Sequence, residues 1–239
     1  QSHFLLLYLM HMKIQQFNYN EIFSFAWGKT RQHAWFLACT AVIYGLIMSA
    51  AKFTPVFDVL VALLLSLSLL SISLAMVKNE SFTFADLFNK LRSPRLVLHF
   101  IALTALYVLV VCALTLPFIA SMTVSFGAVF FGAAVASGKL IALATVTFIL
   151  FCVGVYVSVC YKFFPYVLLE NEHMSLTHII KHTRKITCCN FWPLFVLLIL
   201  LSLFNVVGAM LAGLGLIITV PMSVFALAHV YRKLEAHSH

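Results

Sequence analysis

Residues 56–77 read VFDVLVALLLSLSLLSISLAMV and contain one charged side chain, Asp58. A helix of about 20 apolar residues is long enough to span the roughly 30 Å hydrocarbon core of a bilayer. A second run, residues 96–119, reads LVLHFIALTALYVLVVCALTLPFI and contains no Asp, Glu, Lys or Arg. Together these runs predict an all-α, polytopic membrane protein, because a small soluble domain cannot cover such segments with polar surface.

The composition of the whole chain supports the same class. Of its 239 residues, 63% are hydrophobic and 9% are charged, whereas soluble domains carry about 25% charged residues. In lipid the backbone must satisfy its hydrogen bonds internally, which allows helices or closed barrels, and long unbroken apolar runs favour helices. The stretches between the runs are too short to bury a core of their own. We therefore expect a single integral membrane domain over residues 1–239.

Basic residues predict the number of spans and their orientation. The apolar stretch 121–138 is compatible with a seventh span, a re-entrant element or an outer loop. With six spans, only Lys52 and Lys139 lie outside, and thirteen of the fifteen Lys and Arg residues lie on the inner side. Basic loops mark the cytoplasmic face, so six spans with both termini in the cytoplasm are favoured. The predicted spans are residues 34–51, 56–77, 96–119, 140–161, 191–207 and 214–230.

A short segment that opens with a helix N-cap type of residue precedes the first, third and fifth spans. After Ser175, for example, the apolar residues Leu176, Ile179 and Ile180 share one helical face, and the cations lie away from it. This pattern predicts a short interfacial amphipathic helix before each of three hairpins, with possible repeats at 20–79, 81–172 and 175–232. Alternation of basic loops with hairpins is, however, common to all polytopic proteins. The three opening residues are Asn20, Ser81 and Ser175. The residues expected to face lipid headgroups are Lys90, Arg92, Lys181, Arg184 and Lys185.

Asp58 is the one acidic residue well inside an apolar run, and an intramembrane ionisable group is a functional candidate. It lies three residues after Pro55, so pairing with Lys52 at the outer interface is the favoured interpretation, and a coupling or substrate role is the alternative. Glu170 and Glu172 follow the fourth span. Acid–base chemistry is possible for two carboxylates, but at a span end we expect them to neutralise neighbouring Lys and Arg.

His178 and His182 have the i, i+4 spacing of two metal ligands on a helix. Three basic residues share their polar face and oppose a cation, so a basic surface at the headgroups is favoured over a metal site. The six cysteines lie mostly inside apolar runs and form no C-x-x-C pair, which is typical of small hydrophobic residues. No nucleophile elbow, P-loop, dinucleotide fingerprint or zinc motif occurs. We therefore expect no enzyme activity, no catalytic residues, no cofactor and no metal.

The segment FPYVLL at 164–169, SLTHIIKHTR at 175–184 and NFW at 190–192 resembles the bacterial six-helix inner-membrane proteins of the YciC type. It is also similar to the membrane domain attached to some glycerophosphodiester phosphodiesterases. The resemblance implies six helices and a location in the bacterial inner (plasma) membrane, but no reaction. The apolar connection between the third and fourth spans departs from the pattern, where a more polar loop is common.

Three functions remain in competition. The first is a non-enzymatic component that organises or stabilises lipids or partner membrane proteins, with self-association possible; the net charge of +8 is then explained by the cytoplasmic loops, and no nucleic acid is expected. The second is a small transporter or channel for an ion or small metabolite. The third, a membrane enzyme acting on lipids, rests only on the two glutamates and the histidines. A polar path for transport would have to use Asp58, Ser66, Ser68, Ser71, Ser73, Thr147 and Asn205.

Overall fold

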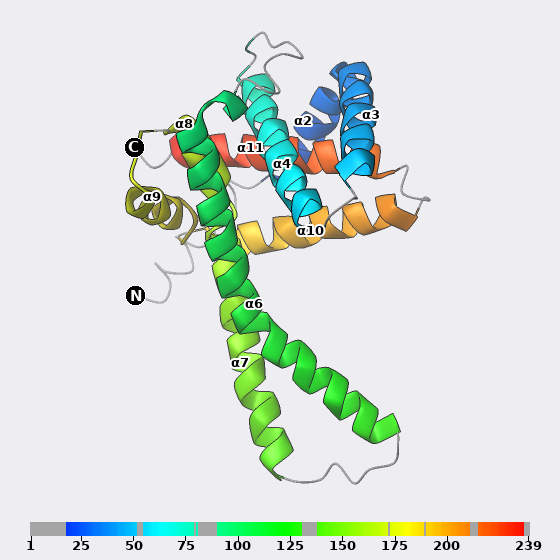
Figure 1. Cartoon of the computed structure of the whole chain (residues 1–239), viewed down its shortest axis with the longest axis vertical. Helices are drawn as coiled ribbons and strands as arrows, with labels where there is room; N and C mark the ends of the chain where they lie inside the picture. Colours follow the sequence, from blue (N-terminus) through cyan, green and yellow to red (C-terminus); the bar gives the residue numbers. More distant parts are fainter. Residues whose placement is uncertain are drawn as a thin grey trace.

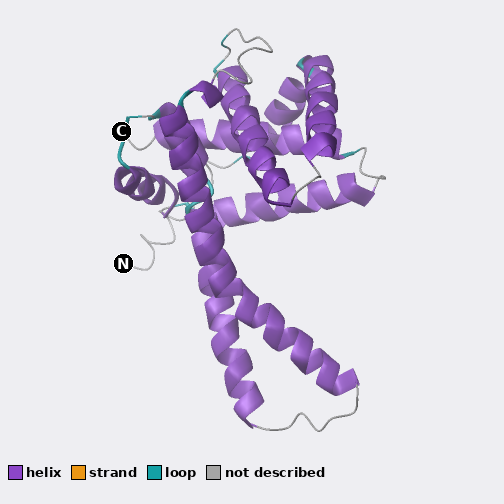
Figure 2. Cartoon of the chain, in the orientation of Figure 1, coloured by secondary structure: helices purple, strands orange, loops and turns teal. Residues whose placement is uncertain are grey.

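The computed structural model describes residues 18–51, 55–78, 80, 90–130, 138–171, 173–188, 190–210 and 215–236. Within these residues every regular element is a helix (Figure 2). In chain order the elements are α2 (Tyr19–Gln32), α3 (Ala34–Ala51), α4 (Pro55–Val77), η1 (Lys90–Arg92), α6 (Pro94–Phe130), α7 (Gly138–Cys160), α8 (Phe164–Glu170), α9 (Leu176–Cys188), α10 (Phe191–Met210) and α11 (Leu216–Ala236).

Four helices in the described part of the chain are long and apolar enough to cross a membrane. They cover Asp58–Val77, Pro94–Val124, Ala144–Glu170 and Phe191–Met210, and the apolar segment Ala34–Ile47 of α3 is shorter. The chain therefore has the helical, apolar character of a multi-pass membrane protein. The predicted span 214–230 falls on α11, which is not among the four. The total of six stays a prediction.

α6 is longer than the span predicted from the sequence. The predicted span ends at residue 119, but the helix continues to Phe130 with Pro117 inside it. Proline cannot donate a backbone hydrogen bond and crowds the preceding turn, so it bends a helix without necessarily ending it. Figure 1 shows α6 bending away from α7 toward its C-terminal end. Residues 121–130 thus continue α6 and are not a loop, whereas residues 131–137 lie outside the described residues.

α11 forms the centre of the helical core. Its buried side chains include Phe225, Ala226, Ala228 and Tyr231, and it contacts α2, α3, α4, α9 and α10. Helices that follow one another also pair, α3 with α4, α6 with α7, and α10 with α11. In Figure 1 α10 and α11 run steeply across the direction of α4 and α6. The axes of α10 and α11 are therefore not parallel to those of α4 and α6 (Figure 1).

The first of the three expected amphipathic segments folds as α2, with a different cap. Its N-cap is Asn18, whose side chain accepts a hydrogen bond from the Glu21 backbone N–H at 3.4 Å. The prediction of Asn20 as cap is wrong, because Asn20 lies inside the first turn of the helix. Ile22 and Ala26 are buried, and α2 packs on α11. The apolar face of α2 is therefore covered by protein.

Two small residues set the distance between α10 and α11. A Cβ on Gly208 would lie 2.6 Å from Thr219 Oγ1, and a Cβ on Gly215 would lie 2.6 Å from the Gly208 carbonyl oxygen. Glycine permits such close approach because it has no side chain. Gly208 and Gly215 therefore allow the two helices to pack closely at this point.

Candidate functional site

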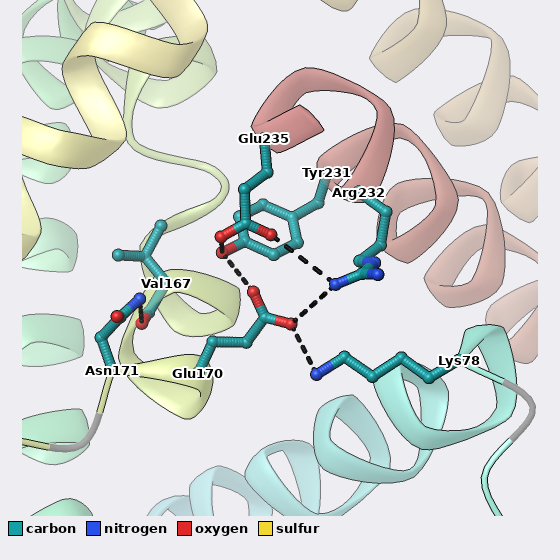
Figure 3. A network of polar contacts seen from close by, with 7 residues as sticks. All are labelled: Lys78, Val167, Glu170, Asn171, Tyr231, Arg232 and Glu235. Carbon is teal, nitrogen blue, oxygen red and sulfur yellow. Dashed lines mark hydrogen bonds and ion pairs between the residues drawn. The ribbon is translucent and has the colours of Figure 1, made fainter. Parts of the chain in front are cut away.

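The strongest constellation of charged side chains surrounds Glu170 at the end of α8 (Figure 3). Lys78, which follows α4, places Nζ 2.9 Å from Glu170 Oε1, and Arg232 of α11 places Nη1 3.5 Å from the same oxygen. The Glu170 side chain is only 12% exposed. A carboxylate this well covered requires compensating charge or hydrogen bonds. One acid therefore neutralises cations from two other helices.

A phenol and a second carboxyl complete this network. Tyr231 donates its hydroxyl proton toward Glu170 Oε2 at 2.8 Å, and Glu235 Oε1 lies 3.2 Å from the same hydroxyl. A phenol has one proton to donate, and Tyr231 gives it to Glu170. The contact with Glu235 is therefore a full hydrogen bond when Glu235 is protonated and donates to the Tyr231 oxygen. Burial, together with the neighbouring Glu170 carboxylate, raises the pKa of Glu235. Arg232 Nη1 lies 3.9 Å from Glu235 Oε2, and its positive charge limits the rise in the pKa of Glu235.

Local structure explains how α8 presents Glu170. The helix ends at this residue because Asn171 leaves the helical conformation, with φ −124° and ψ 60°. The backbone N–H and the side-chain amide of Asn171 both donate to the Val167 carbonyl, at 3.0 and 3.2 Å (Figure 3). On the buried side, Tyr166 stacks on Tyr231 with ring centroids 5.5 Å apart. Aromatic stacking orients both rings. Glu170 is thereby directed at α11.

Part of this network can be predicted from the sequence. Glu170 neutralises neighbouring basic residues, as expected, whereas Glu172 lies outside the described residues. The participation of Tyr231 and Glu235 was missed. The available signal was the scarcity of acids, seven against fifteen Lys and Arg, which makes each carboxylate a preferred partner for several cations.

A second ion pair joins the two ends of the described chain. Lys233 of α11 donates to Glu21 of α2, and this hydrogen bond, with the charge of Lys233, lowers the pKa of Glu21. His229 lies one turn before Lys233 and stacks on Phe25 at 4.1 Å between ring centroids. The polar end of α11 is thus tied to α2 on one side and to α4 and α8 on the other.

α9 divides its residues between a covered and an open face. Ile179 and Thr183 have no exposed surface, and Thr187 donates to the Cys160 carbonyl at 2.6 Å. The three cations expected at lipid headgroups, Lys181, Arg184 and Lys185, are all exposed. Of the two further residues expected there, Arg92 is exposed at the end of η1 and the Lys90 side chain is not described.

The other candidate sites predicted from the sequence lack described partners or ligands. Asp58 lies in the first turn of α4, and its Oδ1 is buried without a hydrogen-bond partner among the described residues. Its expected partner Lys52 falls outside them. His178 and His182 lie on α9, and no group of three potential metal ligands occurs in the described part of the chain. Cys39, Cys112, Cys152 and Cys160 form no disulfide bond within the described part of the chain.

Most hydroxyls of the candidate polar path are used locally. Each of the serines Ser66, Ser68, Ser71 and Ser73 donates to a carbonyl of its own helix at 2.7 to 3.1 Å. On α10, the Asn205 side-chain amide donates to Ser223 of α11 at 3.0 Å. Such bonds satisfy polar groups at membrane depth and hold neighbouring helices together.

Comparison with known proteins assigns no relatives. A scan against protein-family models, a search of curated proteins and a search of solved structures each found no match for this chain. The resemblance to YciC-type proteins therefore stays a prediction, and the functional argument rests on the side chains described above.

Proposed function

We propose that this chain is a non-enzymatic integral protein of a bacterial inner membrane that organises or stabilises lipids or partner membrane proteins. It crosses the membrane six times as three hairpins, with both termini in the cytoplasm. Membrane lipids are its principal partners. The observation that carries the proposal is the open basic face of α9, which holds Lys181, Arg184 and Lys185.

The geometry of α9 fits a headgroup surface. Its opposite face is closed by Ile179, Thr183 and Ile186, all at most 4% exposed, so the helix cannot turn its cations inward. Each Lys or Arg near an anionic membrane surface contributes about 1 kcal/mol of attraction. The apolar helices α7 and α10 contact α9 and hold it in place. The exposed cations of α9 then attract anionic headgroups to the protein.

The test measures the lipids that remain bound through purification. Mass spectrometry of the purified wild type is expected to find anionic phospholipid enriched over the membrane average. The double variant Arg184→Gln/Lys185→Gln loses about 2 kcal/mol of attraction, so its enrichment should fall more than tenfold. Lys29→Gln/Arg31→Gln is the matched control, because it removes two cations from the last turn of α2. A wild type with no enrichment, or equal loss in both variants, contradicts the proposal.

Transport of an ion or small metabolite is the second candidate function. The observation that favours it is Asp58, whose Oδ1 is buried near the start of an apolar helix without a hydrogen-bond partner among the described residues. Intramembrane carboxylates of this kind often mark ion pathways. Flux into liposomes under an imposed gradient is the measurement. A flux that Asp58→Asn abolishes and Glu80→Gln leaves intact supports transport and overturns the organiser proposal.

A further inference from the structure

An apolar cavity of about 340 Å³ lies between α6 and α7. Binding pockets for small molecules span roughly 300 to 1,000 Å³, so this volume holds part of one acyl chain. The cavity reaches the surface at Leu106, which is 51% exposed. Its wall includes Leu106, Tyr107 and Val110 of α6, Val157 of α7, Phe164 of α8 and Ile180 of α9.

A second cavity of about 200 Å³ adjoins the first and shares Tyr107, Tyr161 and Phe164 with it. This second cavity is more polar, because Lys162 and Thr104 line it. The Thr104 hydroxyl is buried without a hydrogen-bond partner among the described residues. Lys162 is exposed and has no ion pair in the part of the chain that the structure describes. A solvent-accessible cation therefore stands beside an apolar cavity.

We propose that the two cavities form one binding site for an anionic phospholipid. An acyl chain enters at Leu106 and occupies the apolar cavity, while the phosphate lies in the second cavity. There the Lys162 ammonium neutralises the phosphate and Thr104 donates its hydroxyl proton to a phosphate oxygen. The site rests on the proposed function, for which it names one specific lipid position.

The position of these cavities along the helices agrees with a lipid. Leu106 and Val110 lie in the first half of α6, and Lys162 is the second residue after the end of α7. The site is therefore near the end of the hairpin where the basic loops gather. Tyrosine prefers the boundary between headgroups and hydrocarbon, and Tyr161 stands at this end. Lysine extends its charge toward headgroups from an apolar stem. α9 adds Ile180 to the wall, and its exposed Lys181 follows directly.

The test uses the full chain in nanodiscs of phosphatidylcholine with or without phosphatidylglycerol, followed by native mass spectrometry. The wild type is expected to retain phosphatidylglycerol in preference to phosphatidylcholine. Lys162→Gln should reduce that retention about tenfold, which corresponds to about 1.4 kcal/mol, and Lys162→Arg should preserve it. Leu106→Trp keeps every charge but blocks the mouth of the cavity, and should lower the retention by a similar factor.

The outcomes separate this site from the proposed function. If Arg184→Gln/Lys185→Gln lowers retention while Lys162→Gln and Leu106→Trp leave it unchanged, the cavity site is wrong and the headgroup surface of α9 stands. A wild type without preference for phosphatidylglycerol overturns both. Circular dichroism and gel filtration verify that each variant is folded. If Lys162→Gln does not fold, Leu106→Trp decides, because unchanged retention in that variant also overturns the site.

Discussion

At the residue scale, Glu170 connects α8 with α4 and α11 through a single carboxylate. Glu170→Gln keeps the shape of the side chain but leaves Lys78 without its counter-charge, and leaves Arg232 with only the more distant Glu235 carboxyl. Because Glu170 is largely covered while its partners are partly exposed, we expect a loss of about 1–3 kcal/mol in the free energy of unfolding.

Thermal unfolding in detergent measures this loss as a lower Tm. Glu80→Gln serves as the control, because Glu80 is exposed and changing it should leave Tm almost unchanged. Equal Tm values for wild type and Glu170→Gln would show that the network does not stabilise the fold.

The two carboxyl groups at the polar end of α11 should respond to pH in opposite directions. Burial, then the nearby Glu170, raises the pKa of Glu235 above its ordinary 4.5. Between the ordinary and the raised pKa the folded state binds more protons than the unfolded state, so stability falls as pH rises through this window. Glu235→Gln should flatten that part of the curve of Tm against pH and leave Tm at neutral pH equal or higher.

Glu21 provides the opposite case. Lys233 lowers its pKa, so its stabilising contribution is present above the ordinary pKa of 4.5 and is lost as pH falls through the lowered value. Glu21→Gln should therefore flatten the acid side of the curve. If Glu235→Gln and Glu21→Gln both changed the Tm curve on the same side of pH 4.5, the partners assigned to Glu235 and Glu21 would be wrong.

At the element scale, the packing of α10 against α11 depends on the missing side chain of Gly208. In Gly208→Ala the new methyl group would meet Thr219 at 2.6 to 2.9 Å. Overpacking of this kind costs about 1–3 kcal/mol, so Tm should fall. Gly45 offers the matched control, because a Cβ there meets nothing within 4 Å.

Replacing Gly45 with alanine should not destabilise the protein. Alanine is favoured over glycine inside a helix by about 1 kcal/mol, so Gly45→Ala should leave Tm unchanged or raise it. A lower Tm for Gly45→Ala than for Gly208→Ala would show that the α10–α11 contact is wrongly placed.

At the scale of the whole molecule, the proposed six crossings would place both termini on one side of the membrane. Reporter fusions after residue 239 and before residue 1 should both give a cytoplasmic signal in bacterial cells. A cytoplasmic N-terminus with a periplasmic C-terminus would mean an odd number of crossings. The segment 121–138 would then be the first to re-examine, because its first part extends α6.

Local physics explains what could be predicted from the sequence. Pro55 begins α4 and the boundaries of α3 match the apolar run 34–51, because a proline at a helix start and unbroken apolar runs act over short distances. Glu170 could be assigned to neutralise cations on charge grounds. Its convergence with Lys78, Tyr231 and Glu235 could not, because these residues come from three segments far apart in the chain.

By itself, the sequence determined that this is a helical, apolar chain of the multi-pass membrane type, because a bilayer demands long apolar segments with internally paired backbone. Only the tertiary structure decided which apolar faces meet protein. The central position of α11, the burial of Ile22 on α2 and the cavity beside Tyr107 all depend on packing between helices. Lipid tails are as apolar as Leu side chains, so hydrophobicity alone cannot distinguish a residue that faces lipid from one that faces another helix.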